Sequence, residues 1–206
     1  MATILLIIIY LAFISLGLPD SMLGAAWPVA YAQLGVPVSY AGFASIGITV
    51  GTVISSLVSV RVIRRFGTGG VTAACVLLTA SALLAISFTK SFVVLLLLAI
   101  PLGLGGGAID AALNNYVALH YKASHMSFLH SFWGVGATIS PLIMSHFLKL
   151  NGYWQGGYRF VSIIQLSLAL IMFLTLPLWG KVPHAANDEL LGGPIEIDNR
   201  AAIKKR

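Results

Sequence analysis

Charged residues are scarce in this sequence. They make up 9% of its 206 residues, whereas soluble globular chains carry roughly 25%, because a folded surface must face water. Hydrophobic residues make up 58%, and the mean hydropathy is +0.94. A chain with so few charges cannot cover itself with a water-facing surface, so most of its surface must face lipid.

Cysteine and acidic residues are also scarce. Cys75 is the only cysteine, so no internal disulfide is possible. The five histidines and six acidic residues never cluster at metal-ligand spacing, and we therefore predict neither a metal nor a cofactor. No Gly-x-Ser-Gly nucleophile motif occurs, and His130 and Ser131 are adjacent, so they point to different faces of a helix. These absences argue against an intramembrane enzyme.

The net charge of +6 does not indicate nucleic acid as a partner. Six of the twelve basic residues lie in two short clusters, Arg61–Arg65 and Lys204–Arg206. Neither cluster has an aromatic platform or a helix-turn-helix context, so we predict no nucleic-acid binding.

Six apolar stretches are long enough to cross a membrane, which takes about 20 mostly apolar residues. The predicted spans are Ala2–Tyr31, Ser39–Val60, Gly70–Phe88, Phe92–Tyr121, Ser127–Leu150 and Tyr158–Gly180. We therefore predict an all-α integral membrane domain over residues 1–180. Residues 181–206 are polar, contain Pro and Gly, and have the composition of a cytoplasmic linker or tail.

The distribution of Lys and Arg predicts the orientation, because cytoplasmic segments carry an excess of both. With both termini cytoplasmic, nine basic residues fall inside and three outside. The inner set is Arg61, Arg64, Arg65, Lys122, Lys181, Arg200, Lys204, Lys205 and Arg206, and the outer set is Lys90, Lys149 and Arg159.

The first and fourth stretches are the longest, near 30 residues or roughly 45 Å of helix. They occupy equivalent places in two successive sets of three helices. A three-plus-three inverted repeat is a common building plan of secondary transporters.

Two acidic residues, Asp20 and Asp110, lie within about 5 Å of the centres of these two long helices. A carboxylate at that depth costs several kcal/mol unless it is paired, hydrated or protonated, so it marks a functional site by default. No basic residue lies at a similar depth, which leaves a water-filled cavity or a proton as the partner. The alternative is a structural Asp that caps a broken helix. For Asp20 this alternative stands, because the adjacent Pro19 disrupts the local helical hydrogen bonds.

Small and aromatic residues accompany the two acids at helical spacing. Gly103, Gly106 or Gly107, Asp110 and Asn114 share one face, and the glycines themselves are most simply helix-packing residues, as are Gly47 and Gly51. Asp20, Gly24, Trp27 and Tyr31 share another face, which suits a ring-shaped polar solute, although Trp27 and Tyr31 equally fit an interfacial aromatic belt. His130, Trp133, Gly134 and Ala137 share a third face, where a lone His is either a packing residue or a proton relay.

Two motifs resemble the fourth and fifth helices of fucose-permease-like major facilitator transporters. They are the segments 105–116 (GGGAIDAALNNY) and 128–136 (FLHSFWGVG). The resemblance implies that Asp110 is the proton-coupling acid, that Asn114 is the Asn of the family, and that His130 stands where the fucose permease itself has Gln. Gly17-Leu-Pro-Asp-Ser21 is similar to the first-helix acid segment, which makes Asp20 a candidate substrate contact.

The loop after the second stretch departs from the superfamily pattern. Arg64 replaces the usual acid, and the basic residues that normally come directly after the Gly of this loop, here Gly67, are missing. The usual gating contacts of this loop are therefore not expected.

Together these features predict the amino-terminal six-helix half of a major facilitator transporter in the plasma or inner membrane. The resemblance implies a sugar-like solute and proton coupling, with Asp110 as coupling acid and Asp20, Asn114 and His130 as substrate contacts. Trp27 is a further candidate contact, because it shares the helix face of Asp20. We expect activity to require a second six-helix half, supplied as a separate chain or by self-pairing. The alternative is a truncated or non-transporting membrane scaffold or sensor.

Overall fold

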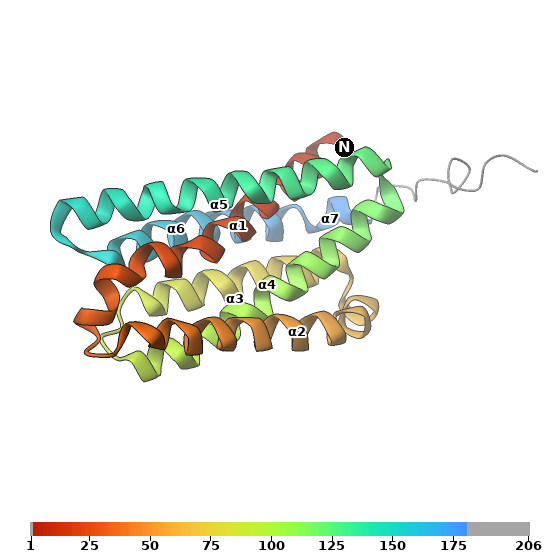
Figure 1. The fold of residues 1–206 in the computed structure, drawn as a ribbon. Helices are drawn as coiled ribbons and strands as arrows, with labels where there is room; N and C mark the ends of the chain where they lie inside the picture. Colours follow the sequence, from red (N-terminus) through yellow and green to blue (C-terminus); the bar gives the residue numbers. More distant parts are fainter. Residues whose placement is uncertain (1, 181–206) are drawn as a thin grey trace, which may run out of the picture.

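The computed structural model describes residues 2–180, which form a bundle of helices (Figure 1). Six are long: α1 (Ala2–Gln33), α2 (Ala41–Phe66), α3 (Thr68–Ile86), α4 (Phe92–His120), α5 (Ala123–Asn151) and α6 (Trp154–Leu174). The short η1 (Val38–Tyr40) precedes α2, and the short α7 (Leu176–Trp179) follows α6. The predicted all-α class is confirmed. The predicted linker over 181–206 lies outside the described residues.

Five of the long helices, α1, α2, α3, α4 and α6, have the length and apolar composition needed to cross a membrane. The fifth predicted span, α5, is 29 residues long and packs along α1. Its three histidines and five serines lower its hydropathy, and it does not reach the apolarity of a candidate membrane span. The span that hydropathy supports least is thus still a long helix of the bundle.

Two helix ends differ from the predicted ones more than the others do. α2 continues past the predicted end at Val60 to Phe66. The added residues include arginines, which are good helix formers and are favourable near a helix C-terminus. Gly67, at φ +75°, then ends the helix in a conformation that glycine adopts at little cost. α6 stops at Leu174 instead of continuing to Gly180, because Pro177 has no N–H for the helical ladder.

The helix contacts follow the predicted repeat. α1 packs most closely with α5, α2 packs most closely with α4, and α3 packs against α6. In the repeat, α1 corresponds to α4, α2 to α5 and α3 to α6. The α1–α5 pair of the bundle therefore corresponds to the α4–α2 pair, and the α3–α6 pair corresponds to itself. The two halves of the described chain therefore use the same packing scheme.

Glycines bring the helices of these pairs into backbone contact. A Cβ at Gly17 of α1 would collide with the carbonyl of Trp133 on α5, and one at Gly136 of α5 would collide with the carbonyl of Ile14. In the other pair, Gly51 of α2 lies against the α4 backbone and Gly103 of α4 lies against the α2 backbone. The packing role is confirmed for Gly51 and for Gly103, Gly105 and Gly107 of α4, whereas a Cβ at Gly106 would meet only the Leu16 side chain at 3.6 Å.

Buried apolar side chains form two clusters, one toward each end of the bundle. The first includes Leu5, Phe13, Leu113 and Trp179, and the second includes Met22, Trp27, Leu83 and Trp154. Because the clusters are separate, the middle of the bundle has room for polar groups.

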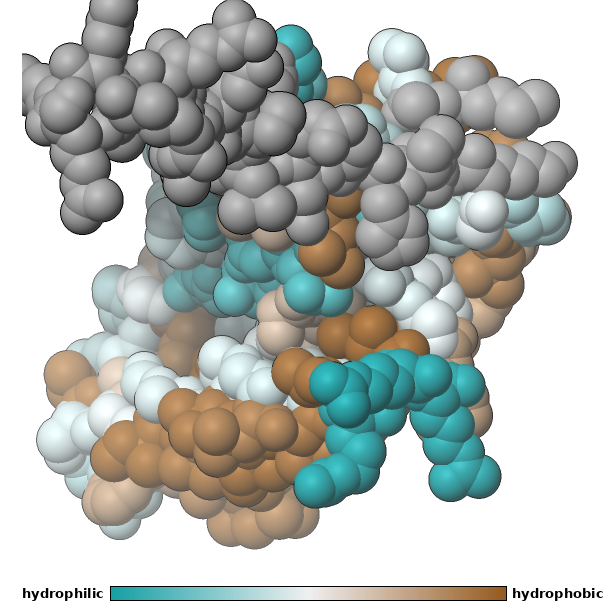
Figure 2. Space-filling model, turned by 90° about the vertical axis from the view of Figure 1, so that its right-hand side faces the viewer, coloured by the Kyte–Doolittle hydropathy of each residue, from teal (hydrophilic) through white to brown (hydrophobic). Residues whose placement is uncertain are grey.

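The start of α1, the α2–α3 and α4–α5 junctions and α7 all lie at one end of the bundle (Figure 1). An end-on view from that side shows a hydrophilic patch beside a broad apolar surface (Figure 2). The exposed basic side chains at this end of α2 are Arg61, Arg64 and Arg65. Five of the nine basic residues assigned to the cytoplasmic side lie outside the described residues, so the orientation stays a prediction.

Candidate functional site

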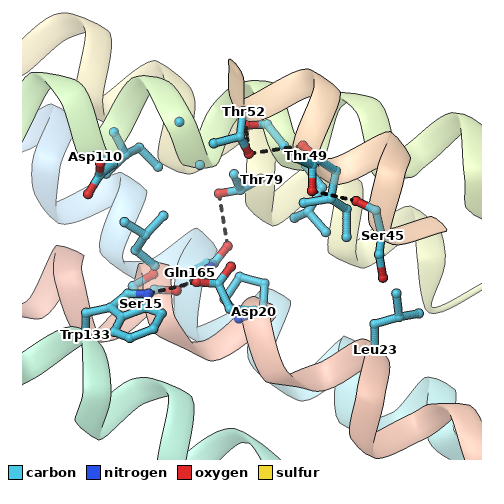
Figure 3. A pocket seen from close by; sticks show the side chains of 18 of the residues that line it. Ser15, Asp20, Leu23, Ser45, Thr49, Thr52, Thr79, Asp110, Trp133 and Gln165 are labelled. Carbon is cyan, nitrogen blue, oxygen red and sulfur yellow. Dashed lines mark hydrogen bonds between the residues drawn. The ribbon is translucent and has the colours of Figure 1, made fainter. Parts of the chain in front are cut away.

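A cavity of about 710 Å³ lies in the middle of the bundle, between the two apolar clusters. All six long helices contribute to its wall. Its polar lining residues are Ser15, Asp20, Ser45, Thr49, Thr52, Thr79, Asp110, Trp133 and Gln165. Figure 3 shows most of these side chains around the open space between α1, α2 and α4.

Both acids predicted from the sequence, Asp20 of α1 and Asp110 of α4, line this cavity. None of the lining residues within 2–180 is Lys or Arg. The glycine face predicted around Asp110 is also present, since Gly103, Gly106 and Gly107 line the same wall. The fold therefore brings two carboxylates, far apart in the sequence, into one space without a neutralising basic side chain in its wall.

Asp20 is held by a neighbouring helix. The indole Nε1 of Trp133, on α5, donates a hydrogen bond of 2.7 Å to its Oδ2 (Figure 3). Gly17 allows this contact, because its missing side chain lets α1 approach the α5 backbone at Trp133. The sequence placed Trp133 on a face with His130 but did not connect it with Asp20.

Asp110 is held within its own helix. The side-chain amide of Asn114, four residues later, donates a hydrogen bond of 3.0 Å to Oδ1 of Asp110. His130 of α5 lies close enough to Asp110 to interact with it electrostatically, and its ring packs edge-on against Phe13 at 6.1 Å. Asn114 and His130 accompany Asp110 but do not line the cavity.

Trp27 lies away from the cavity. Its ring is buried in the second apolar cluster, edge-on to Phe92 at 6.2 Å, and its Nε1 donates a hydrogen bond of 2.7 Å to the carbonyl of Val38. These contacts join α1 to η1 and to the start of α4. The position of Trp27 gives no support to the predicted substrate contact.

Several cavity residues were not singled out in the sequence. They are Ser15, Ser45, Thr49, Thr52, Thr79 and Gln165. Serine and threonine are common in membrane helices, so their side chains carry no signal until the fold shows which face meets the cavity. Of these residues, Gln165 could most readily have been predicted to lie at the cavity, because an amide inside an apolar helix needs a hydrogen-bond partner.

The α2 hydroxyls present acceptors to the cavity. Thr49 donates to the carbonyl of Ser45 at 2.9 Å, and Thr52 lies within 3.0 Å of the carbonyl of Ile48 and 3.2 Å of that of Gly103. Because each hydroxyl has a single proton, which the backbone takes, its lone pairs remain for a bound molecule.

No group of three or more potential metal-ligating side chains occurs within residues 2–180. The cavity chemistry in this part of the chain is therefore that of carboxylates, hydroxyls, amides and one indole.

A multi-pass helical membrane protein with a polar cavity at mid-bundle is the class that the fold and the site define. The profile of the Major Facilitator Superfamily matches residues 9–197, and the chain belongs to this superfamily. The superfamily consists of membrane transporters and is not enzymatic.

Among curated proteins, the chain is similar to Bypass of stop codon protein 6 of Saccharomyces cerevisiae (strain ATCC 204508 / S288c). The two are 31% identical over 108 residues. The match covers 51% of this chain and 22% of the yeast protein. The matched segment therefore spans about a fifth of the length of that relative.

Proposed function

We propose that this chain is one half of a secondary transporter that moves a small, polar, sugar-like solute together with protons. The observation that carries the proposal is the meeting of Asp20 and Asp110 in one cavity at mid-bundle. Membrane carboxylates that face a cavity are typical of solute and proton pathways. Their origin in the corresponding helices of two repeats matches the midplane site of transporters with this building plan.

The polar groups of the cavity support a solute that is rich in hydrogen-bond donors. Both carboxylates accept hydrogen bonds, and the hydroxyls of Thr49 and Thr52 donate their protons to backbone carbonyls of α2. Trp133 has also given its N–H to Asp20. A neutral polyol complements these acceptors, whereas an anion would meet two carboxylates and no basic lining residue within 2–180.

Asp110 is the proposed proton carrier. The side-chain amide of Asn114 has both a donor nitrogen and an acceptor oxygen, so it can bond to the Asp110 carboxyl in its charged or its protonated form. The Asp110 side chain therefore keeps its place during a proton cycle. His130, beside it on α5, is the proposed group that senses this charge. Asp20 is the proposed solute contact.

A second six-helix half is the proposed partner. α2 is the least buried of the candidate spans and exposes large apolar side chains along its length, with Ile46 at 60% and Leu57 at 79% exposure. Asp20 is exposed as well. A carboxylate facing lipid is costly, so a covering half, from a separate chain or a second copy, completes the cavity wall.

Both termini are proposed to be cytoplasmic, in a plasma or inner membrane. In a variant whose Cys75 is replaced by Ala, a single cysteine at Ser91 should react with an impermeant reagent from outside. A single cysteine at Thr68, at the opposite end of the bundle, should react only from inside. The reverse pattern would reject the orientation.

Uptake into vesicles tests the function. Uptake of polyols should be abolished by a protonophore and should depend on protein density, because single-copy vesicles lack the second half. Robust uptake at single-copy dilution would reject the need for a partner. The absence of any uptake at high density, with folded protein, would favour the scaffold or sensor alternative.

A further inference from the structure

Pro19 leaves one backbone carbonyl of α1 without its helical donor. In an α-helix the N–H of residue 19 would bond to the carbonyl of residue 15, and proline has no N–H. The carbonyl of Ser15 therefore needs another partner, and Ser15 is buried, with 3% of its surface exposed. An unpaired carbonyl at this depth in a membrane costs several kcal/mol.

The partner is the side chain of Gln165 on α6. Its Nε2 donates a hydrogen bond of 2.7 Å to the carbonyl of Ser15, and Gln165 is only 1% exposed. Figure 3 shows Gln165 next to Ser15 and Asp20. This bond bridges α6 and α1 at the residue whose helical bond the proline removes.

A third helix contacts the other end of this amide. The hydroxyl of Thr79, on α3, lies 3.1 Å from Oε1 of Gln165 and 2.9 Å from the carbonyl of Val76 on its own helix. The Ser15 carbonyl can only accept, so the end of the amide that faces Ser15 must be Nε2, which leaves Oε1 facing Thr79. Thr79 is in turn held by α4, where a Cβ at Gly105 would lie 2.5 Å from its methyl group. The amide has no alternative orientation that satisfies both neighbours.

We propose that Gln165 is a positioning residue, which binds the carbonyl left free by Pro19 and thereby holds the segment of α1 that carries Asp20. The clamp consists of Ser15, Thr79 and Gln165, all of which line the cavity beside Asp20. The role of the clamp in solute binding rests on the proposed function, whereas its role in placing Asp20 is independent of that function.

α1 also contains a natural control. Pro28 removes the helical donor to the carbonyl of Gly24 in the same way, but no side chain within residues 2–180 donates to that carbonyl. Gly24 is exposed and a Cβ there would meet nothing within 4 Å. Replacing Pro28 therefore perturbs the same helix without touching the clamp.

The test combines Gln165→Leu with Pro19→Ala, which restores the N–H that Ser15 lacks, and with the control Pro28→Ala. A membrane-permeant carbodiimide modifies the carboxyls of the purified full chain, and peptide mass spectrometry measures Asp20 relative to Asp110. We expect Gln165→Leu to raise the relative modification rate of Asp20 by about fivefold, because α1 loses the bond that fixes this segment. When Gln165→Leu is combined with Pro19→Ala, the increase in the Asp20 rate over Pro19→Ala alone should fall below twofold. When Gln165→Leu is combined with Pro28→Ala, the increase over Pro28→Ala alone should remain about fivefold.

An unchanged Asp20 rate in Gln165→Leu, or an equal increase in all three backgrounds, would overturn the proposal. If Gln165→Leu does not yield folded protein, Thr79→Val gives the second test. It keeps the amide but removes the donor to Oε1, and its smaller increase, about twofold, should likewise vanish with Pro19→Ala. Persistence of that increase would also overturn the proposal.

Solute uptake separates this inference from the proposed function. In vesicles that take up solute, Gln165→Leu should raise the half-saturating concentration about tenfold, and Pro19→Ala should restore it to within twofold of its own background. If the unaltered chain takes up no solute, the proposed function fails, and the carbodiimide rates still decide whether the clamp exists.

Discussion

The two acid-bearing helices occupy equivalent places in the repeat but hold their carboxylates in different ways. In both, a glycine three residues before the acid lies against the backbone of a neighbouring helix, Gly17 before Asp20 and Gly107 before Asp110. Asp110 then finds its amide partner four residues along its own helix. Asp20 follows a proline break and depends on two other helices.

The difference separates local from tertiary control. A bond between residues four apart forms wherever the helix forms, so the Asp110 geometry survives changes elsewhere in the bundle. The Asp20 geometry requires α5 for its Trp133 partner and α6 for the clamp at Ser15. We infer that the Asp110 end of the site, the proposed proton carrier, is rigid and that the Asp20 end, the proposed solute contact, responds to the packing of α1.

The largest expected effect comes from removing the negative charge of either acid. Asp110→Asn should abolish proton-driven accumulation and leave solute exchange at equilibrium largely intact, because it removes the proton carrier but not the solute contact. Asp20→Asn should instead abolish both. Accumulation assays and counterflow in dense proteoliposomes distinguish the two patterns. Unchanged uphill uptake in Asp110→Asn would reject its assignment.

The next effect concerns the glycines that allow backbone contact. Gly103→Ala and Gly17→Ala place a Cβ against a neighbouring backbone carbonyl, and overpacking of this kind costs about 1–3 kcal/mol. The matched controls are Gly106→Ala and Gly24→Ala, which face the cavity and should change stability by less than about 0.5 kcal/mol. Thermal unfolding in detergent measures all four. Equal losses in both sets would contradict the described packing.

Trp133→Phe tests whether Asp20 needs its partner on α5. The change keeps an aromatic ring but removes the N–H that donates to Oδ2. A hydrogen bond to a charged group contributes about 1.5–3 kcal/mol, so solute affinity should fall about tenfold or more. Proton coupling should be preserved, because Asp110 is unaffected. A loss of coupling with unchanged affinity would reverse the roles of the two acids.

Asn114→Ala should have the smallest effect. It removes a neutral amide from Asp110, which typically contributes about 1 kcal/mol, so transport should weaken about fivefold without being abolished. Asn115→Ala, which alters the next residue of the same helix, is the control and should be close to neutral. Uptake rates at several external pH values check both variants, and a complete loss of transport in Asn114→Ala would show that its amide does more than hold Asp110.

Much of the fold could be predicted because membrane insertion imposes simple rules. A spanning helix must be about 20 residues long and apolar, so hydropathy located all six long helices, although α5 met that rule least well. The repeat and the depth of Asp20 and Asp110 followed from counting residues along the chain. The helix ends were less predictable, since arginines continue α2 in water where hydropathy no longer applies.

Length, apolarity and position along a chain need no knowledge of neighbours, so a multi-pass helical membrane protein with two acids near the centres of its two longest helices could be predicted from the amino-acid sequence. The side chains that meet those acids follow from how the helices pack. That packing brings Trp133 to Asp20 and Gln165 to the carbonyl that Pro19 leaves free, and it buries Trp27 away from the cavity. The first two contacts join residues more than a hundred positions apart, and no local periodicity encodes them.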